Sequence, residues 1–364
     1  MKIDRVETVP FSIPMKRPSR WGAAGLREAA EGVLIKVHTS EGIVGQAEAI
    51  PRPYIYGDTL FSLKHILDEW LIPGLVGADP FETERIWNSF SRVAWNPSAK
   101  AALDMALFDV KAQACKVPVY QFLGGWQPRV PVSYMVSLKP LAEMQAEAEQ
   151  MARMGIKTFK LKGGQDLRKD IGMITGLRKA LGEEVGLYVD ANQGYDLSDA
   201  LRFFKACEEM DILCVEEPVP VFQGSVRKRI ARSSSVPIMG DDSCFTLDQV
   251  IKEVELEAIG IINIKTSRTG YYVSQKIVQL AEAAGIICAV GSQGATGIGT
   301  LTAGHFAAAF PTVKFPSELT TFYKHQDDLL TELPRIVDGF MELSSTPGLG
   351  ISVDEAKLAK YKIG

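Results

Sequence analysis

Five short apolar runs, each with an ionisable residue at or near its end, follow one another between residues 158 and 265. They read TFKLK (158–162), GLYVDAN (186–192), ILCVEE (212–217), VPIMGD (236–241) and GIINIK (260–265). Runs of this length are typical of buried strands, and the longer amphipathic segments between them are typical of helices. Because strands that alternate with helices pair in parallel, this stretch predicts successive β/α units.

Three further runs extend this pattern in both directions. They cover residues 130–137, 286–291 and 313–318, so that eight candidate strands recur about every 25 residues. Eight such strands predict an α/β protein whose sheet closes into a (β/α) barrel. A doubly wound open sheet is the alternative, but no Gly-x-Gly-x-x-Gly follows the first strands.

The sequence on either side of the barrel stretch does not follow the alternation of strands and helices. The first 125 residues open with β-like runs separated by polar or glycine turns, which predict an antiparallel meander; the runs cover 3–13, 32–39 and 42–48. Helical patterns follow, one starting near the N-cap candidates Asp58 and Thr59 and another over 98–109. Residues 327–364 return to turn-rich, β-like sequence that could add strands to the first stretch.

Composition and charge exclude several classes of protein. The chain has 364 residues and a formal net charge of -4, which provides no basic field for nucleic acid. No apolar run is long enough to cross a bilayer, and the first residues lack the layout of a signal peptide. The five cysteines form no Cys-x-x-Cys pair, so neither disulfides nor a zinc site are expected. We therefore expect a cytoplasmic protein without nucleic-acid or membrane partners.

Three acidic residues, Asp190, Glu216 and Asp241, end three consecutive strands of the series. The carboxyl ends of barrel strands meet on one rim, where catalytic groups lie. Three carboxylates in one place repel one another, and one of them would take a proton unless a cation neutralised them. Because all the ligands are oxygen atoms, we expect Mg²⁺, with Mn²⁺ as the second choice. Asn192 and Asp242 lie beside these acids and are expected to support the ligand shell.

Lysines end the strands on both sides of the three acids. Lys160 and Lys162 share one face of the second strand, and Lys265 ends the sixth. These two strands lie opposite each other in an eight-stranded barrel, so Lys162 and Lys265 should approach the centre from two sides. Neighbouring ammonium groups and desolvation should lower their pKa, so that a lysine can exchange protons with carbon. We predict catalytic roles for both and an electrostatic role for Lys160. For Lys265, a counterion of the substrate carboxylate is the alternative.

A divalent cation and lysines together suit a small carboxylic acid, because the cation neutralises the enediolate that forms when the carbon beside the carboxylate loses a proton. Candidates for substrate contact lie in two loops near the N-terminus and at the ends of the seventh and eighth strands. They are Trp21, Arg52, Tyr54, Tyr56, Ser292, Gln293 and Glu318. The glycine-rich loop 291–299 leads into a helix whose N-terminus could hold the carboxylate; a tight turn without a ligand is the alternative.

At these residues the sequence resembles the enolase superfamily, and in particular its muconate lactonizing enzyme subgroup. The resemblance covers essentially the whole chain and rests on Lys160-x-Lys162, Asp190-x-Asn192, Glu216-Glu217-Pro218, Asp241-Asp242 and Asn263-Ile264-Lys265. It implies a modified (β/α)7β barrel of the TIM type over 126–326. It also implies an N-terminal α+β capping domain over 1–125, which the segment 327–364 completes.

The same resemblance implies site residues and an assembly. The first acid of each acidic motif matches a metal ligand, which assigns Mg²⁺ to Asp190, Glu216 and Asp241, and Lys162 and Lys265 match the acid/base pair. A homo-oligomer is also expected. The mandelate racemase subgroup is disfavoured, because it would need a histidine after the seventh strand, which here ends in Gly291-Ser292.

Within the subgroup, the segments 52–57, 96–101 and 264–270 look most like those of muconate cycloisomerases. That likeness implies reversible conversion of cis,cis-muconate to muconolactone, with Lys162 as the acid that protonates the enolate carbon and Lys265 as a mainly electrostatic group. Two positions depart from the pattern. Asp242 stands where a glutamate is common, and Gln293-Gly294 stands where several members carry glutamate or methionine. Both departures can alter the choice of substrate.

Two other functions stay open. One is a racemase or epimerase of an N-acyl amino acid, a dipeptide or a related acid, which would use both lysines. The end of the eighth strand, Ser317-Glu318-Leu319-Thr320-Thr321-Phe322, contains no Asp-x-Asp, which disfavours dipeptide epimerases. The other is a metal-binding barrel without catalytic activity.

Overall fold

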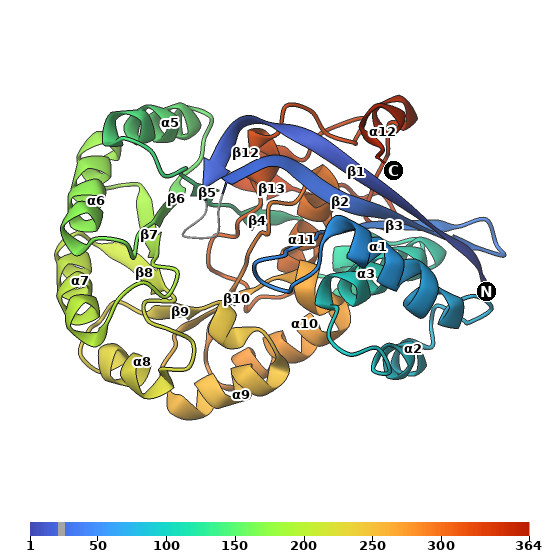
Figure 1. Ribbon diagram of the computed structural model, residues 1–364, viewed down its shortest axis with the longest axis horizontal. Coiled ribbons are helices and arrows are strands. Elements are labelled where there is room, and N and C mark those ends of the chain that lie inside the picture. Colours follow the sequence, from blue (N-terminus) through green and yellow to red (C-terminus); the bar gives the residue numbers. More distant parts are fainter. Residues whose placement is uncertain (21–25, 364) are drawn as a thin grey trace.

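A curled parallel sheet surrounded by helices lies beside an antiparallel sheet with its own helices (Figure 1). The computed structural model describes residues 1–20 and 26–363, and the side chains of all of these except residues 19, 20 and 26. This architecture confirms the predicted class, a modified (β/α) barrel with an N-terminal α+β cap.

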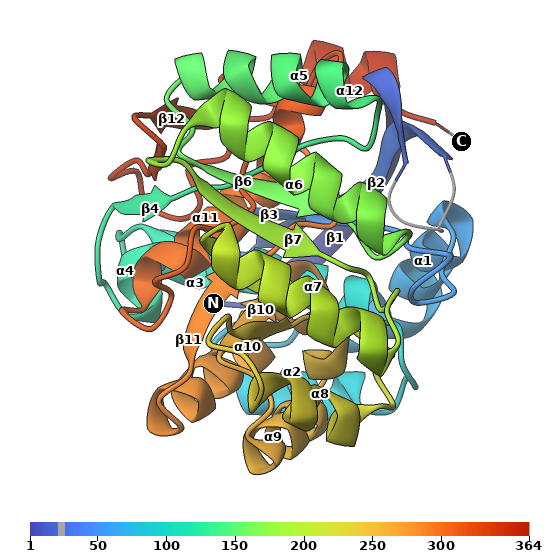
Figure 2. The ribbon, with the colours of Figure 1, turned by 90° about the vertical axis from the view of Figure 1, so that its left-hand side faces the viewer.

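The parallel sheet has seven strands in the order β11-β10-β9-β8-β7-β6-β5. Their bounds are β5 (Tyr134–Met135), β6 (Thr158–Lys162), β7 (Gly186–Asp190), β8 (Ile212–Glu216), β9 (Ile238–Gly240), β10 (Ile261–Ile264) and β11 (Ile287–Val290). Helices follow the strands and cover the outside of the sheet, where Figure 2 shows several of them side by side. They are α5 (Leu141–Arg153), α6 (Leu167–Leu181), α7 (Leu197–Glu209), α8 (Gly224–Ala231), α9 (Leu247–Leu256), α10 (Thr266–Ala283) and α11 (Gly297–Ala309).

Residues 312–318 close the ring without forming a continuous strand. Glu318 N donates to Val290 O (2.8 Å) on one side, and Ser133 N donates to Ser317 O (2.8 Å) on the other. The predicted strand over 313–318 is therefore reduced to isolated parallel bridges. The predicted strand over 130–137 is split into β4 (Arg129–Pro131) and β5. Prolines at 131 and 316 account for both interruptions, because proline has no N–H to donate to a neighbouring strand.

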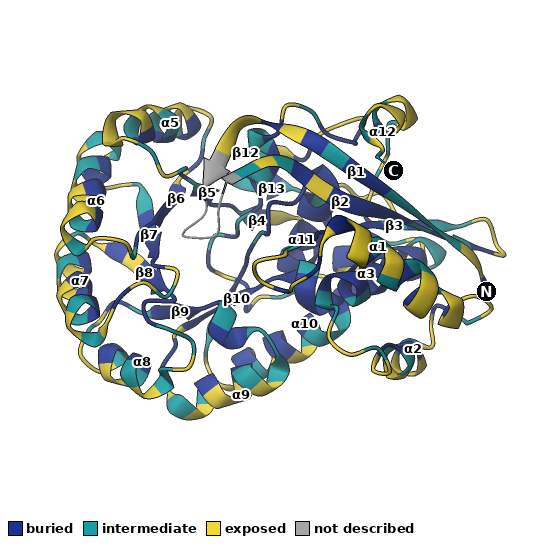
Figure 3. Cartoon of the chain, viewed as in Figure 1, coloured by how far each residue is buried: buried dark blue, intermediate teal, exposed yellow. Residues whose placement is uncertain are grey.

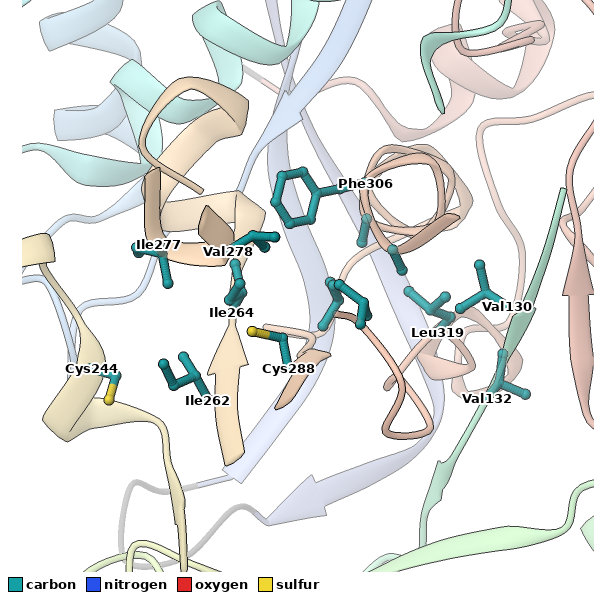
Figure 4. Packing of buried hydrophobic residues seen from close by; sticks show 14 of the residues in the cluster. Val130, Val132, Cys244, Ile262, Ile264, Ile277, Val278, Cys288, Phe306 and Leu319 are labelled. Carbon is teal, nitrogen blue, oxygen red and sulfur yellow. The ribbon is translucent and has the colours of Figure 1, made fainter. Parts of the chain in front are cut away.

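Side chains of the barrel strands alternate between the outer and the inner face. On the outer face, Ile262 and Ile264 of β10 pack with Ile277 and Val278 of α10 (Figure 4). On the inner face, one apolar layer forms a floor, made of Tyr188, Cys214, Met239, Ile261, Ala289 and Phe315. Figure 3 shows the resulting burial: dark blue strands inside and exposed outer helix faces. The next inward positions carry the charged residues, so the charged layer lies directly above this apolar floor.

The N-terminal sheet, in the order β1-β2-β3, confirms the predicted antiparallel meander. Its strands are β1 (Ile3–Arg20), β2 (Leu26–Thr39) and β3 (Val44–Ala49). The helices of this region are α1 (Leu60–Ile66), the π-helix η1 (Leu67–Leu71), the 3-10 turn η2 (Ile72–Gly74), α2 (Thr83–Phe90), α3 (Pro97–Ala114) and α4 (Val119–Leu123). Thr59 caps α1 as predicted, since its side chain accepts from Ser62 N. Asp104 of α3 joins cap to barrel by accepting from Tyr271 N of α10 (2.6 Å).

The C-terminal segment meets only part of the expectation that it adds strands to the first stretch. Lys362 forms an isolated antiparallel bridge with Phe11 of β1, but the two C-terminal strands pair elsewhere. β12 (Arg335–Val337) and β13 (Phe340–Glu342) pair with β4 in a separate three-stranded sheet. The last helix, α12 (Glu355–Tyr361), does contact the cap, because Leu358 packs with Phe11 and Ile13 of β1. The domain boundaries at 125/126 and 326/327 stay predictions. Among the described helices, none combines the length and apolar character that spanning a bilayer requires.

Breaking the ion pair between Arg227 of α8 and Glu253 of α9 is expected to destabilise the fold by about 3–5 kcal/mol. Both side chains are buried, with Arg227 Nε 3.2 Å from Glu253 Oε2, and Arg227 also donates to Val221 O (2.9 Å). Arg227→Met would leave the glutamate buried without its partner. The change is measured by urea unfolding. Arg232→Met is the matched control; Arg232 is exposed and pairs with exposed Glu257, so it should cost less than about 0.5 kcal/mol. Equal shifts for the two variants would contradict this assignment.

Candidate active site

Lys160 of β6 lies at the centre of the charged layer. Its Nζ is 3.0 Å from Asp190 Oδ2 and 2.7 Å from Glu216 Oε2, and it also contacts Glu318 Oε1. Burial lowers the pKa of Lys160, but the charges of these three carboxylates raise it well above the ordinary lysine value. Lys160 therefore holds a fixed positive charge among the carboxylates, which suits an electrostatic role.

Lys162 and Lys265 end strands on opposite walls, since three strands separate β6 from β10 in the sheet. Lys162 Nζ donates to Asp190 Oδ2 (2.6 Å) and to Asn192 Oδ1 (3.0 Å). Lys265 Nζ donates to Asp241 Oδ2. Both lysines line one cavity of about 410 Å³, together with Asp190, Asn192, Asp241 and Asp242. The structure thus brings the predicted lysines and two of the three predicted acids together around one space. The third acid, Glu216, is fully buried and is not among the residues that line the cavity.

The charges in this layer influence each other strongly. Burial alone would raise the pKa of Asp190, but Lys160 and Lys162 lower it to about 2. Burial and the neighbouring charge of Asp190 raise the pKa of Glu216 well above the usual carboxyl range. The lowered lysine pKa expected from the sequence is wrong for Lys160 and also for Lys265, whose pKa is raised. Burial lowers the pKa of Lys265, but the charge of Asp241 outweighs this effect.

The three strand-end carboxylates offer the oxygen donors that a hard cation prefers. Glu216 Oε2 and Asp241 Oδ1 are buried and accept no well-oriented hydrogen bond, although cationic nitrogens of Lys160 and Arg268 lie 2.7 and 3.0 Å away. Unsatisfied acceptors of this kind are costly unless they find a partner. Each of the three carboxylates contacts a lysine. Among the described residues, no three or more His, Cys, Asp or Glu side chains already lie in an arrangement that could hold a metal ion. The donor chemistry fits Mg²⁺, and the ligand set stays a proposal.

Residues behind the carboxylates hold them in place. Asn263 of β10 donates from Nδ2 to Glu216 Oε1 (3.2 Å). Gly291 leaves room for this amide, because a Cβ there would lie 2.5 Å from Asn263 Oδ1. Glu217 Oε1 accepts from Asp241 N and from Ser243 N of the turn η3 (Asp242–Cys244), both at 2.7 Å, and so fixes the backbone that carries Asp241.

The predicted supporting residue Asp242 does not orient a lysine at short range. Its Oδ2 accepts from Gln193 Nε2 (3.1 Å), and its Oδ1 is 3.7 Å from Arg268 Nη1. The other predicted supporting residue, Asn192, contacts Lys162 directly, and its backbone N donates to Asp190 Oδ1 (3.0 Å). Asn192 is therefore placed to orient both the lysine and the carboxylate.

Asn263→Leu is expected to weaken Mg²⁺ binding by about 10- to 100-fold, because the donor that orients Glu216 would be lost while the side-chain volume is nearly kept. The affinity is measured by calorimetric titration of Mg²⁺ into wild type and variant. Asn88→Leu, a change in the cap helix α2 far along the chain from the barrel strands, is the control and should leave the affinity unchanged. An Asn263→Leu variant with wild-type affinity would show that the amide does not orient a ligand.

Of the predicted substrate contacts, Trp21 lies outside the described residues. Five of the others line the cavity: Arg52, Tyr54, Ser292, Gln293 and Glu318. Tyr54 is 78% exposed, so its ring projects from the cap loop at the mouth of the barrel. Tyr56 is buried behind the wall and is not among the lining residues; it packs edge-on against Phe245 at a ring distance of 5.1 Å.

The loop after β11 is held by protein groups. Gln293 Nε2 donates to the hydroxyl of Tyr56, and Gln293 Oε1 accepts from Ser267 Oγ (2.8 Å). At the start of α11, Thr296 N donates to Glu48 Oε1 (2.9 Å) and Gly297 N donates to Asp328 Oδ2 (2.7 Å). These protein carboxylates occupy the helix N-terminus, so the idea that it holds the substrate carboxylate is wrong and the tight turn is correct.

Several cavity residues have no signal at a strand end and were missed by the sequence patterns. They are Ile55, Met135, Gln193, Gly294, Thr320, Thr321 and Lys324. The last two begin and end the 3-10 turn η4 (Thr321–Lys324). This turn follows the irregular eighth strand, where no periodicity marks the direction of a side chain.

Comparison with known families identifies related domains over most of the chain. Residues 5–124 match the mandelate racemase / muconate lactonizing enzyme N-terminal domain, and residues 143–357 match the enolase C-terminal domain-like family. The L-Ala-D/L-Glu epimerase of Bacillus subtilis is 36% identical over 316 residues, which make up 85% of this chain and 86% of that protein.

Solved structures of two enzymes have the same fold as this chain. A muconate lactonizing enzyme from Mycobacterium smegmatis, complexed with muconolactone, has a TM-score of 0.96 at 37% identity and covers 100% of both chains. A dipeptide epimerase from Enterococcus faecalis V583, complexed with Mg and the dipeptide L-Leu-L-Tyr, has a TM-score of 0.92 at 30% identity over 97% of this chain and 100% of that one. The chain therefore belongs to the enolase superfamily, in its mandelate racemase / muconate lactonizing enzyme family.

Proposed function

We propose that the protein is a Mg²⁺-dependent cycloisomerase of the muconate lactonizing type, which converts cis,cis-muconate and muconolactone into each other through an enolate. One observation carries the proposal: Lys162 and Lys265 face one cavity from opposite walls, with the acids of β7, β8 and β9 between them. The relatives described above are enzymes of the isomerase or epimerase type, and members of the superfamily use Mg²⁺.

In this proposal Asp190, Glu216 and Asp241 hold the cation, which can also be Mn²⁺. When bound, Mg²⁺ neutralises the negative charge that builds up on a substrate carboxylate as the enolate forms. Lys160 adds a second fixed positive charge next to the same carboxylates.

Lys162 carries the proton transfer. In the lactonizing direction, an oxygen of one muconate carboxylate bonds to the nearer carbon of the far double bond and closes a five-membered ring. The electron pair of that double bond moves toward the other carboxylate, which becomes an enolate. The Lys162 ammonium then gives its proton to the enolate carbon, and solvent restores that proton to the neutral amine. Lys265, held by Asp241, stabilises the same charge from the opposite wall without exchanging a proton.

The electrostatics after the eighth strand support a dianionic acid over a dipeptide. A dipeptide brings an α-ammonium, which needs an anionic partner. Glu318 is already engaged by Lys160 and accepts from Ser292 N (3.3 Å). Two residues on, Thr320 is neutral and donates to Ser133 O (2.9 Å). No spare pair of acids is therefore present at this strand end among the described residues.

Racemisation or epimerisation of an N-acyl amino acid is the second candidate function. The presence of two lysines on opposite walls favours it, because each could serve one face of the α-carbon. The 36% identity to the L-Ala-D/L-Glu epimerase of Bacillus subtilis supports epimerisation as the type of reaction, but it does not support this substrate class. An N-acyl group carries no positive charge, so the lack of a spare acid pair does not count against this substrate class.

Incubation with candidate acids in deuterated water separates the two functions. A cycloisomerase consumes muconate in a Mg²⁺-dependent reaction, which ultraviolet absorbance follows and EDTA stops, and it leaves N-acyl amino acids unlabelled. A racemase places solvent deuterium on the α-carbon of an otherwise unchanged N-acyl amino acid. Labelling of N-acyl amino acids without any turnover of muconate would overturn the proposal. The homo-oligomer expected from the family is tested by light scattering.

A further inference from the structure

Lys324, the last residue of η4, is a cavity cation that the proposed reaction does not use. Its Nζ donates to Met135 O (2.7 Å) and to Ser137 Oγ (3.0 Å), which are both neutral acceptors. An ammonium group has three protons to donate. Within the described part of the chain Lys324 forms no ion pair, whereas neighbouring Lys139 pairs with Glu147 Oε2 at 2.8 Å. The Lys324 ammonium also lies 5.2 Å from the centroid of the Tyr134 ring. Its described partners are therefore all neutral, and none of them is an anion.

Lys324 lies on the boundary between two cavities. It lines the cavity of about 410 Å³ that contains Lys162 and Lys265, and also a second cavity of about 620 Å³ between α5 and the end of β1. The charged groups that act on it are already engaged: Glu318 contacts Lys160, and Glu147 is bound by Lys139 and by the hydroxyl of Tyr134.

A charged group in such surroundings is unfavourable unless an anion joins it. Burial lowers the pKa of Lys324 to about 8, and the charges of Lys139 and Lys162 add to this effect against the opposing charge of Glu147. The amine is therefore mostly protonated at neutral pH. Thr320, Thr321 and Met135 line the same cavity and carry no charge, and the acid of this wall, Glu318, is paired with Lys160.

We infer that Lys324 binds a second, distal carboxylate of the substrate, so that the substrate class is a dicarboxylate whose other carboxylate lies among the strand-end acids and lysines. The inference rests on the proposed function for the reaction at the first carboxylate and names the group that recognises the other end. Lys324 is a specificity residue in this account and takes no part in proton transfer.

Calorimetric titration of adipate tests the inference, because this saturated six-carbon dicarboxylate cannot react. The full chain with Mg²⁺ is titrated with adipate and with monomethyl adipate, which has lost one charge. Wild type is expected to bind adipate about 10- to 100-fold more tightly than the monoester, as for a hydrogen bond to a charged group. Lys324→Met is expected to bind the two ligands within about threefold. Lys16→Met makes the same charge change on the other cavity without releasing Glu147, and it should keep the preference for adipate.

Each result decides the matter. A wild type that binds both ligands equally, or that binds no adipate, overturns the inference whether or not the variants fold, and so does a folded Lys324→Met that keeps the wild-type preference. If muconate is turned over but the preference is missing, the inference fails and the proposed function stands. If the preference exists and depends on Lys324 but muconate is not turned over, the proposed function fails and the dicarboxylate site stands.

Discussion

Lys162→Ala is expected to lower kcat for muconate by about 10²- to 10⁴-fold, the usual contribution of a positioned general acid. Lys162 donates hydrogen bonds to both Asp190 and Asn192, which hold its amine toward the cavity. Alanine has no amine that could deliver the proton. Lys265→Ala is expected to cost only about tenfold, because Lys265 transfers no proton in the proposed reaction and Lys160 still holds a positive charge beside the strand-end acids. The values come from initial rates of muconate consumption with saturating Mg²⁺.

The comparison between the two lysines also separates the candidate functions. A racemase needs both amines, so Lys265→Ala would abolish deuterium exchange starting from one enantiomer and leave exchange from the other. Equal losses of 10²-fold or more for the two alanine variants with muconate would contradict the assignment of a single acid. Thermal melting of each variant shows whether the loss has a structural cause.

Glu216→Gln is expected to abolish Mg²⁺-dependent turnover, with a loss of about 10³-fold or more, because a ligand charge worth several kcal/mol would be removed. Glu216 is fully buried, and one of its oxygens lacks a well-oriented hydrogen bond. The adjacent Glu217 offers a matched control. It is equally buried, but it accepts from backbone and side-chain groups of Ser243, so Glu217→Gln should cost about 10- to 100-fold through positioning alone.

Paramagnetic resonance of added Mn²⁺ gives the readout for both glutamate variants. Free and bound Mn²⁺ have different signals, so the affinity is measured without any substrate. We expect Glu216→Gln to lose tight Mn²⁺ binding and Glu217→Gln to keep most of it. Wild-type Mn²⁺ affinity in Glu216→Gln would remove this residue from the ligand set.

The barrel and its charged layer could be predicted because both follow from local alternation. An apolar run that ends in Asp190 or Glu216 predicts a strand. Alternation along that strand then places its last residue on the inner face at the carboxyl end of the barrel. The same rule did not extend to the eighth strand, where Pro316 interrupts the ladder, nor to Lys324 in the turn beyond it.

Contacts between distant segments could not be predicted from a local pattern. Glu48 reaches the start of α11 from 248 residues away, and nothing near the glycine-rich loop indicates that a protein carboxylate occupies its helix N-terminus. The lysine pKa expectation failed for a related reason. It considered repulsion between ammonium groups, whereas Lys160 and Lys265 are both paired with buried carboxylates, and for these two lysines that attraction dominates.

Anomalous X-ray diffraction from crystals soaked in Mn²⁺ shows whether the three carboxylates hold one cation, because the signal comes from the ion alone. We expect one strong peak in the barrel cavity, with Lys162 and Lys265 on either side. An oxygen of each of Asp190, Glu216 and Asp241 should lie about 2.1 Å from it, the distance for a small hard cation. A barrel without a peak, or a peak held by other residues, would contradict this expectation.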